Sequence, residues 1–349
     1  METSVVESFG SDCEYDYSAK DLIGMGSFGR VYKAKLTNLS NELIGKSGLA
    51  VKIINLDKDT DLLTDPKKRS DLIERWKKVL YELKHDHLVQ YHKVSLITAV
   101  GGITIEFLMD YYKDDTLRVL LDNREKSKKL LKEKTVVCHA VQISDALAFL
   151  HQNRTIHGDL KPSNVLVKRR QHNHDHLVIS DLDDLVVMQQ GSTKPHDIAT
   201  LKASIRYMSP EMLKKFGLVD EKLPQTPGRM TDIWSFGCIL IDLLNHCFGI
   251  REKLLVRTDV ETSALEYYEV QDTTTPSMFA TKIIDGYVPV VNEKISPDFG
   301  DLVQHCLNVH SKQRPLAEDV KTALLRIRGR LVPNEQEKEA LQPCICSVP

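Results

Sequence analysis

The sequence predicts an α+β fold in two parts, a small antiparallel sheet with one helix followed by a larger helical part. Short apolar segments typical of strands dominate the first third of the chain, and apolar residues at three- and four-residue steps dominate the rest. A length of 349 residues suits two such parts better than one small core. With 42% hydrophobic and 28% charged residues, the composition is globular and excludes a mostly disordered chain.

The first part is expected to consist mainly of strands. Residues 1–18 are polar and acidic and are predicted to form a flexible tail. The stretch 21–51 has a strand-like pattern, and residues 48–54 are predicted to form a short buried strand. Further strands are predicted near 88–94 and 103–109.

One helix is predicted between these strands. Asp65-Pro66 is a helix start, and apolar residues recur at helical steps from there to about residue 84. The apolar residues of this helix are Leu72, Ile73, Trp76, Val79, Leu80 and Leu83.

Beyond residue 114 the pattern becomes helical. A strongly amphipathic helix is predicted over 135–152, and two short strands are predicted at 165–167 and 177–179. The remaining predicted segments are helices over 232–245, 298–308 and 317–331, followed by an extended tail from residue 332.

Charge and cysteine content narrow the function classes. The 47 basic and 49 acidic residues give a net charge of -2, so nothing in the overall charge favours nucleic acid as a partner. No apolar run reaches the length of a membrane span, and we expect neither a transmembrane segment nor a secretory signal. The 7 cysteines are scattered without a C-x-x-C pair, which favours a cytoplasmic or nuclear location.

A glycine-rich segment is the first candidate for chemistry. It reads Gly24-Met25-Gly26-Ser27-Phe28-Gly29-Arg30-Val31. A dinucleotide-binding turn has similar glycines but requires a helix directly after them, whereas here a strand continues. Glycines between two strands allow backbone N–H groups to lie over phosphates, and a plain glycine-rich hairpin is the alternative.

Lys52 is the second candidate, because it lies in the apolar strand around Ala50-Val51-Lys52. Burying an ammonium group is costly unless the group meets an anion, and a phosphate would be one. The alternative is a strand lysine whose aliphatic stem carries the charge to solvent.

The most specific segments are His157-Gly158-Asp159-Leu160-Lys161-Pro162-Ser163-Asn164-Val165-Leu166-Val167 and Ser180-Asp181-Leu182-Asp183. Asp159 can accept a proton from an attacking hydroxyl, and Lys161 can neutralise charge on a transferred group. Asn164 and Asp181 carry the oxygen ligands that suit Mg²⁺.

With these motifs the chain resembles the eukaryotic protein kinase family over about residues 19–331. Three later motifs follow in the family's order: Ser209-Pro210-Glu211, Asp232-Ile233-Trp234-Ser235-Phe236-Gly237 and Gln313-Arg314-Pro315. The resemblance implies that Arg314 pairs with Glu211, as the corresponding residues of kinases do.

The family's bilobal kinase fold is expected to divide this chain into a small antiparallel-sheet N-lobe over 19–110 and a helical C-lobe over 111–331. Residues 332–349 would then be a C-terminal tail. The residues of the catalytic loop and the aliphatic residues are similar to those of kinases of mitogen-type cascades or tyrosine-kinase-like Ser/Thr kinases.

The resemblance implies transfer of the γ-phosphoryl group of ATP to Ser/Thr hydroxyls of protein substrates, in intracellular signalling. Mg²⁺ is the implied metal, with Mn²⁺ as a second candidate. Lys52 would hold the phosphates and Asp159 would orient the substrate hydroxyl, with Lys161 neutralising charge. Asn164 and Asp181 would bind the metal ions.

The nucleotide site is implied by the same matching. Ala50 and Leu166 would enclose the adenine, while backbone groups of Asp110 and Tyr112 would bind its edge beside Met109. The implied cofactor-binding residues are Ile23, Gly24, Met25, Gly26, Ser27, Phe28, Gly29, Arg30, Val31, Ala50, Lys52, Met109, Asp110, Tyr112 and Leu166.

Two features resemble the serine/threonine-specific kinases. Lys161-Pro162-Ser163-Asn164 is their form of the catalytic loop, and Ser204 stands where they have a Thr that bonds the catalytic Asp and Lys. Residues 184–204 are polar and resemble an activation loop, with hydroxyls at Ser192, Thr193 and Thr200.

Three positions depart from the family pattern. Gly158 replaces an Arg that binds an activation-loop phosphate, and Asp183 replaces the Gly of the metal motif. Trp76 stands where a helix glutamate usually pairs with the strand lysine. Either a shift of helix register brings Glu74 to that place, or Lys52 pairs with Asp181 or another acid.

These departures leave more than one function open. An active Ser/Thr protein kinase is favoured because all five of Lys52, Asp159, Lys161, Asn164 and Asp181 are retained. The alternatives are a pseudokinase that acts as a nucleotide-binding scaffold or allosteric partner, and a small-molecule kinase on a related fold. The sequence identifies no scaffold or upstream partner.

Overall fold

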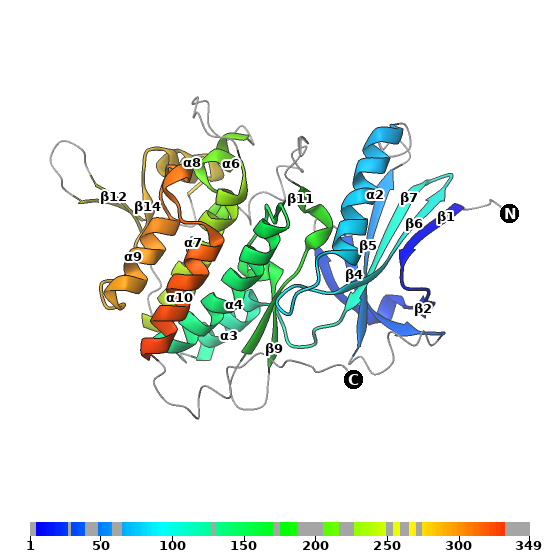
Figure 1. Ribbon diagram of the computed structural model, residues 1–349, viewed down its shortest axis with the longest axis horizontal. Coiled ribbons are helices and arrows are strands. Elements are labelled where there is room, and N and C mark those ends of the chain that lie inside the picture. Colours follow the sequence, from blue (N-terminus) through cyan, green and yellow to red (C-terminus); the bar gives the residue numbers. More distant parts are fainter. Residues whose placement is uncertain are drawn as a thin grey trace. The chain divides into compact units, whose positions relative to one another are not determined.

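The computed structural model shows two groups of elements along the chain (Figure 1). The residues it describes are 5–26, 29–38, 48–57, 65–127, 130–169, 175–187, 205–215, 227–248, 254–258, 265–269 and 274–331.

The chain divides into two compact units, each with its own core. The first unit comprises Met1–Asp114 and Val178–Val187, and the second comprises Asp115–Leu177 and Met188–Pro349. The first unit thus contains the N-terminal segment and residues 178–187 in addition to the predicted N-lobe of 19–110.

The first unit is built on a seven-stranded antiparallel sheet with the order β1-β6-β7-β5-β4-β2, in which β3 also pairs with β4. Its strands are β1 (Val5–Gly10), β2 (Tyr15–Asp16), β3 (Leu22–Gly26), β4 (Gly29–Leu36), β5 (Leu49–Asp57), β6 (Tyr91–Ala99) and β7 (Gly102–Asp110). A 3-10 turn at Ala19–Asp21 precedes β3, and another at Leu182–Asp184 precedes β11 (Val186–Val187).

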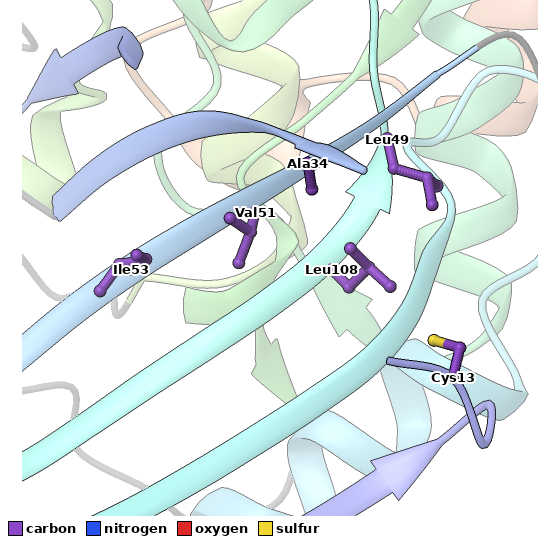
Figure 2. Close-up of a cluster of buried hydrophobic side chains, with 6 residues drawn as sticks. All are labelled: Cys13, Ala34, Leu49, Val51, Ile53 and Leu108. Atoms are coloured by element: carbon purple, nitrogen blue, oxygen red, sulfur yellow. The ribbon is translucent and has the colours of Figure 1, made fainter. Parts of the chain in front are cut away.

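The two faces of this sheet have different apolar layers, because side chains alternate along a strand. Leu49, Val51 and Ile53 of β5 belong to a buried cluster on one face (Figure 2). The other members of that cluster are Cys13, Ala34 and Leu108. The intervening position Lys52 therefore belongs to the opposite face.

Helix α2 (Pro66–Tyr81) contributes to that opposite face. The Asp65 carboxylate caps it by accepting hydrogen bonds from the N–H groups of Lys67 and Lys68, and Pro66 takes its first turn. Trp76 is 2% exposed and meets the Phe107 ring of β7 edge-on, with 5.4 Å between ring centroids. The predicted helix is confirmed and ends a few residues earlier than expected.

The expectation of a flexible tail over 1–18 does not hold for residues 5–10. Strand β1 pairs along the outer edge of β6, and it also contacts α2. The Arg69 guanidinium lies 2.5 Å from the Glu7 carboxylate, and the Gly10 N–H donates to the Tyr81 hydroxyl at 3.0 Å. The polar composition of residues 1–18 did not indicate a strand. Strand β1 forms through pairing with β6, which is far away in the sequence.

The segment after β1 is also fixed to the sheet. The hydroxyls of Tyr15 and Tyr17 donate to the two carboxylate oxygens of Glu106, at 2.6 and 2.8 Å. Cys13 lies in the apolar cluster with 2% of its surface exposed. The N-terminal segment thus covers part of the sheet face that α2 leaves open.

The second unit is mainly helical. Helix α4 contacts α7 and α10, and α7 contacts α9. The helices are α3 (Leu117–Ser127), α4 (Glu133–Gln152), α6 (Pro210–Lys215), α7 (Arg229–Phe248), α8 (Pro276–Ile284), α9 (Pro297–Cys306) and α10 (Ala317–Leu331). Shorter 3-10 turns are at Pro162–Asn164, Ile205–Tyr207 and Ser311–Gln313.

Short strands accompany these helices. They are β8 (Thr155–Ile156), β9 (Val165–Arg169), β10 (Asp175–Ile179), β12 (Leu254–Thr258), β13 (Leu265–Glu269) and β14 (Val288–Pro289). The two strands predicted at 165–167 and 177–179 are confirmed as β9 and β10, which pair with each other, whereas the small sheet β13-β12-β14 was not predicted.

The two-part α+β architecture predicted from the sequence is confirmed. The predicted tail over 332–349 lies outside the described residues. In the part of the chain that is described, no helix combines the length and the apolar character that crossing a membrane requires.

Candidate active site

Lys52 is the centre of the charged cluster in the first unit. It is buried in β5, with only 6% of its surface exposed. Its Nζ lies 2.5 Å from Oδ1 of Asp181 and 2.7 Å from Oδ2 of Asp183. Both carboxylates come from the short turn that follows β10, so one segment provides both partners of the lysine.

The two carboxylates keep Lys52 charged. Burial by itself would lower the pKa of Lys52, but the charges of Asp183 and Asp181 outweigh burial and raise the pKa above its ordinary value. Two carboxylates facing one ammonium leave an excess of negative charge, which favours a cation as the next ligand.

The Asp181 and Asp183 side chains differ in exposure. The Asp181 side chain is 21% exposed and its backbone has φ +68°, in the left-handed region that Asp tolerates better than most residues. The Asp183 side chain is only 2% exposed. Solvent therefore reaches the first carboxylate and hardly reaches the second.

No shift of helix register brings Glu74 to Lys52. The Glu74 side chain is 67% exposed and pairs with Lys77 on α2, at 2.8 Å. Trp76 occupies the buried position, packed on Phe107. The second alternative is confirmed: Lys52 pairs with Asp181 and with another acid, Asp183. Asp183 was not assigned to Lys52 from the sequence, and the replacement of Gly by Asp at 183 is the signal that could have found this partner.

The glycine-rich segment forms the hairpin of β3 and β4, in which Gly26 pairs with Gly29. Met25 is 74% exposed. Ser27 and Phe28 lie outside the described residues. A strand follows the glycines, so the segment is a hairpin and not the start of a helix.

The first and third glycines of the pattern have different structural roles. Gly29 has φ +131°, and a Cβ there would lie 2.1 Å from the backbone oxygen of Ile53 on β5. A Cβ at Gly24 would meet nothing closer than the Val31 Cβ at 3.9 Å. Gly29 is therefore required by the sheet itself, whereas a side chain at Gly24 would make only an ordinary van der Waals contact.

This difference predicts that Gly29→Ala lowers the free energy of unfolding by about 1–3 kcal/mol, because its Cβ must displace backbone of β5. Gly24→Ala is the matched control and should change stability by less than about 1 kcal/mol. Urea unfolding of both variants checks this. Equal losses in the two variants would contradict it.

The other predicted nucleotide residues of the first unit lie around β5 and β7. Ala50 is buried and stands opposite Met109 in the strand register. The Asp110 N–H donates to the Gln90 carbonyl at 3.0 Å. Ile23, Arg30 and Val31 belong to the glycine hairpin, and Tyr112 follows β7.

A second charged cluster lies in the second unit. The Lys161 ammonium lies 2.5 Å from Oδ2 of Asp159. The Asn164 amide nitrogen donates to the Asp159 backbone carbonyl at 2.9 Å and to its carboxylate at 3.3 Å. The 3-10 turn at Pro162–Asn164 brings these side chains together, and the buried Leu160 fixes the loop beneath them.

Asp232 of α7 holds the start of this loop. Its carboxylate is fully buried and accepts hydrogen bonds from the N–H groups of His157 and Gly158, each at 2.9 Å. Nε2 of His151 lies 2.9 Å away. Burial would raise the pKa of Asp232, but its hydrogen bonds and the neighbouring histidines lower it. The sequence marked Asp232 as a motif residue without giving it this role.

Gly158, which departs from the Arg expected from the family resemblance, has φ +80° and so takes a left-handed backbone conformation. A glycine adopts it without strain. The loop is thus held by Asp232 through backbone N–H groups.

The structure groups the predicted residues in two clusters. The cluster of the first unit contains Lys52 and Asp181, and that of the second unit contains Asp159, Lys161 and Asn164. Leu166 lies on β9 of the second unit. That all of them form one site stays a prediction. Ser192, Thr193, Thr200 and Ser204 lie outside the described residues.

The model of the protein kinase domain family matches residues 17–324. The chain belongs to the protein kinase family. The match covers the sheet from Tyr17 onward, both charged clusters and the helices up to Leu324 in α10.

Similar curated proteins are serine/threonine kinases. The chain is 27% identical over 301 residues to the serine/threonine-protein kinase D1044.8 of Caenorhabditis elegans, which covers 86% of this chain and 26% of that protein. It is 24% identical over 311 residues to MAP3K epsilon protein kinase 1 of Arabidopsis thaliana, covering 88% and 18%. It is 28% identical over 332 residues to the serine/threonine-protein kinase VIK of Arabidopsis thaliana, covering 91% and 61%. The chain thus spans less than two thirds of each.

A further kinase feature is the buried pair of Glu211 and Arg314 in the second unit. Nη1 and Nη2 of Arg314 donate to the two carboxylate oxygens of Glu211 at 2.7 and 3.0 Å. The pairing expected from the resemblance is therefore confirmed.

Proposed function

We propose that this kinase transfers the γ-phosphoryl group of ATP to Ser/Thr hydroxyls of protein substrates. The observation that carries the proposal is the presence of both charged clusters with their partners in place. Lys52 is held charged beside Asp181, and Asp159 is held by Lys161 and Asn164. Membership of the kinase family supports the same reaction.

The donor sets fit the cofactors that the family uses. Asp181 and Asn164 offer carboxylate and amide oxygens, which are the ligands that Mg²⁺ or Mn²⁺ prefers. The buried ammonium of Lys52 suits a phosphate oxygen, and the lack of a side chain at Gly24 favours close approach of a phosphate to the hairpin backbone. When bound, ATP supplies the phosphoryl group and the metal neutralises its charge.

The remaining chemistry belongs to the side chains of the second cluster. Asp159 accepts the proton of the substrate hydroxyl at its carboxylate, and the nearby Lys161 ammonium stabilises negative charge on the transferred group. Asn164 orients the Asp159 carboxylate through its amide hydrogen bond. Catalysis is thus mainly positioning and charge stabilisation, with a kcat expected at about 1–100 s⁻¹.

Ser/Thr specificity is part of the proposal. It rests on the Lys161-Pro162-Ser163-Asn164 form of the loop and on relatives whose names are those of serine/threonine kinases. A role in intracellular signalling is supported by the similarity to MAP3K-type kinases. A cytoplasmic or nuclear location is supported by the 7 scattered cysteines, none of which forms a C-x-x-C pair in the sequence.

The test is transfer of labelled phosphate from ATP to a generic basic protein, with Mg²⁺ or Mn²⁺ present, followed by identification of the labelled amino acids. We expect label on Ser and Thr, and loss of label when EDTA removes the metal. Label on Tyr alone would contradict the proposed specificity. No label, with nucleotide binding retained, would favour a nucleotide-binding pseudokinase.

A further inference from the structure

The two carboxylates that lie against the Lys52 ammonium, those of Asp181 and Asp183, both come from the turn after β10. In α2 the position that faces the lysine in other kinases holds Trp76, which is buried. One acid of the pair, Asp183, stands where the family has Gly. Both departures from the family pattern, Trp76 in place of Glu and Asp183 in place of Gly, therefore affect the ion pairing of Lys52.

Asp183 is fixed on both of its oxygens. Its Oδ2 accepts from Lys52 at 2.7 Å, and its Oδ1 accepts from the Tyr91 hydroxyl at 3.2 Å. The same hydroxyl accepts from the Leu182 N–H at 3.3 Å. Since the Asp183 side chain is only 2% exposed, its carboxylate is turned into the protein and hardly reaches solvent.

Three aromatic rings in edge-on contact pack beside the Asp183 site. The Phe107 ring lies edge-on to Trp76, with 5.4 Å between centroids, and also edge-on to Tyr91, with 5.9 Å between centroids. Tyr91 in turn donates to Asp183. Trp76 thus offers Lys52 no charge. It packs on Phe107, which in turn packs on Tyr91, the residue that donates to Asp183.

Asp181 occupies the more accessible side of Lys52, with a side-chain exposure of 21%. A metal would compete with Lys52 for this carboxylate. If Asp181 turned to a metal, Asp183 would still hold the ammonium. If Asp181 were the one acid beside Lys52, the ammonium would have no carboxylate partner once Asp181 bound the metal.

We infer that Asp183 is the positioning residue of Lys52 and replaces the missing helix carboxylate. It holds the ammonium in place for phosphate while Asp181 binds the metal. The inference rests on the proposed function in that it assumes Mg²⁺·ATP as the ligand of Lys52.

The test measures binding, so it does not require phosphoryl transfer. Asp183→Asn removes the charge and keeps the shape. The probes are a non-hydrolysable ATP analogue with Mg²⁺, and adenosine, each titrated by calorimetry. The matched control is Glu74→Gln, which neutralises an exposed carboxylate on α2. Thermal melting of each variant reports whether it is folded.

We expect Asp183→Asn to weaken binding of the ATP analogue by roughly 10-fold or more, since a charge-assisted hydrogen bond to the lysine is lost. Adenosine has no phosphates, so its affinity should stay within about 2-fold of the wild type. Glu74→Gln should leave the affinities for the ATP analogue and for adenosine unchanged. Unchanged binding of the analogue to Asp183→Asn, or equal weakening of adenosine, would overturn the inference.

Tyr91→Phe keeps the inference testable if Asp183→Asn does not fold. It leaves the charge of Asp183 and removes the hydroxyl that holds Oδ1. We expect analogue binding to weaken by roughly 2- to 5-fold with adenosine unchanged; no change in analogue binding would count against the inference.

Failure of the two proposals can be distinguished. If the wild type binds the analogue and transfers no phosphate, the proposed function fails, and the variants still decide the role of Asp183. If the wild type transfers phosphate and Asp183→Asn raises neither the ATP KM nor the analogue Kd, only the inference fails. A wild type that does not bind the analogue overturns both.

Discussion

Asp159→Asn is expected to lower the kcat of phosphoryl transfer by a factor of about 10²–10⁴, the range that a positioned general base contributes. The amide cannot accept the proton of the substrate hydroxyl. Its oxygen can still accept a hydrogen bond from Lys161, so the loop should keep its conformation. The KM for ATP should change little, because Asp159 is assigned to the hydroxyl and not to the nucleotide.

Asp122→Asn is the matched control for this prediction. Asp122 is also in the second unit, its side chain is 46% exposed, and it pairs with Arg118 on α3. Steady-state kinetics should show wild-type rates for this variant. A kcat for Asp159→Asn within about 10-fold of the wild type would exclude Asp159 as the base. Loss of activity at Asp159 also separates the chain's own activity from that of a contaminating kinase.

Arg314→Met is expected to lower the free energy of unfolding by about 3–5 kcal/mol, because it leaves the buried carboxylate of Glu211 without a counter-charge. The side chains of Arg314 and Glu211 are 0% and 1% exposed. Arg314 also donates to the partly buried carbonyls of Asn308 and Met230, at 2.7 and 2.8 Å, and these acceptors lose a donor as well. Urea unfolding followed by circular dichroism measures the loss.

Arg330→Met provides the surface comparison. Arg330 pairs with Asp298, and its side chain is 64% exposed. An exposed pair contributes at most about 1 kcal/mol, so this variant should unfold close to the wild type. Adding Glu211→Leu to Arg314→Met should recover part of the lost stability, since it removes the buried charge. A loss below about 1 kcal/mol for Arg314→Met would contradict the argument.

Local patterns predicted much of the fold and of the candidate site. The helix over 66–81 follows from its cap and its apolar spacing, and the hairpin of β3 and β4 follows from glycines between two strand-like segments. The close contact of Asp159 with Lys161 follows from a loop of a few residues. In each case the partners are near one another in the sequence.

What the sequence did not predict depends on distant partners. Strand β1 lies in a segment of polar and acidic composition, and it forms because the edge of β6 offers backbone groups 83 to 93 residues away. The role of Asp183 depends on a contact with Lys52 over a separation of 131 residues. The backbone of Asp181 is left-handed, with φ +68°, and neither composition nor spacing encodes that conformation.

The N-terminal segment bears on where a recombinant version of this kinase can begin. The family match starts at residue 17, yet strand β1 and the buried Cys13 precede that point. A shortened protein that starts at 17 would leave the backbone of β6 unpaired along its edge and an unfilled space beside Leu108. An open strand edge promotes association between molecules, so low solubility of such a truncation would reflect the cut and not the kinase.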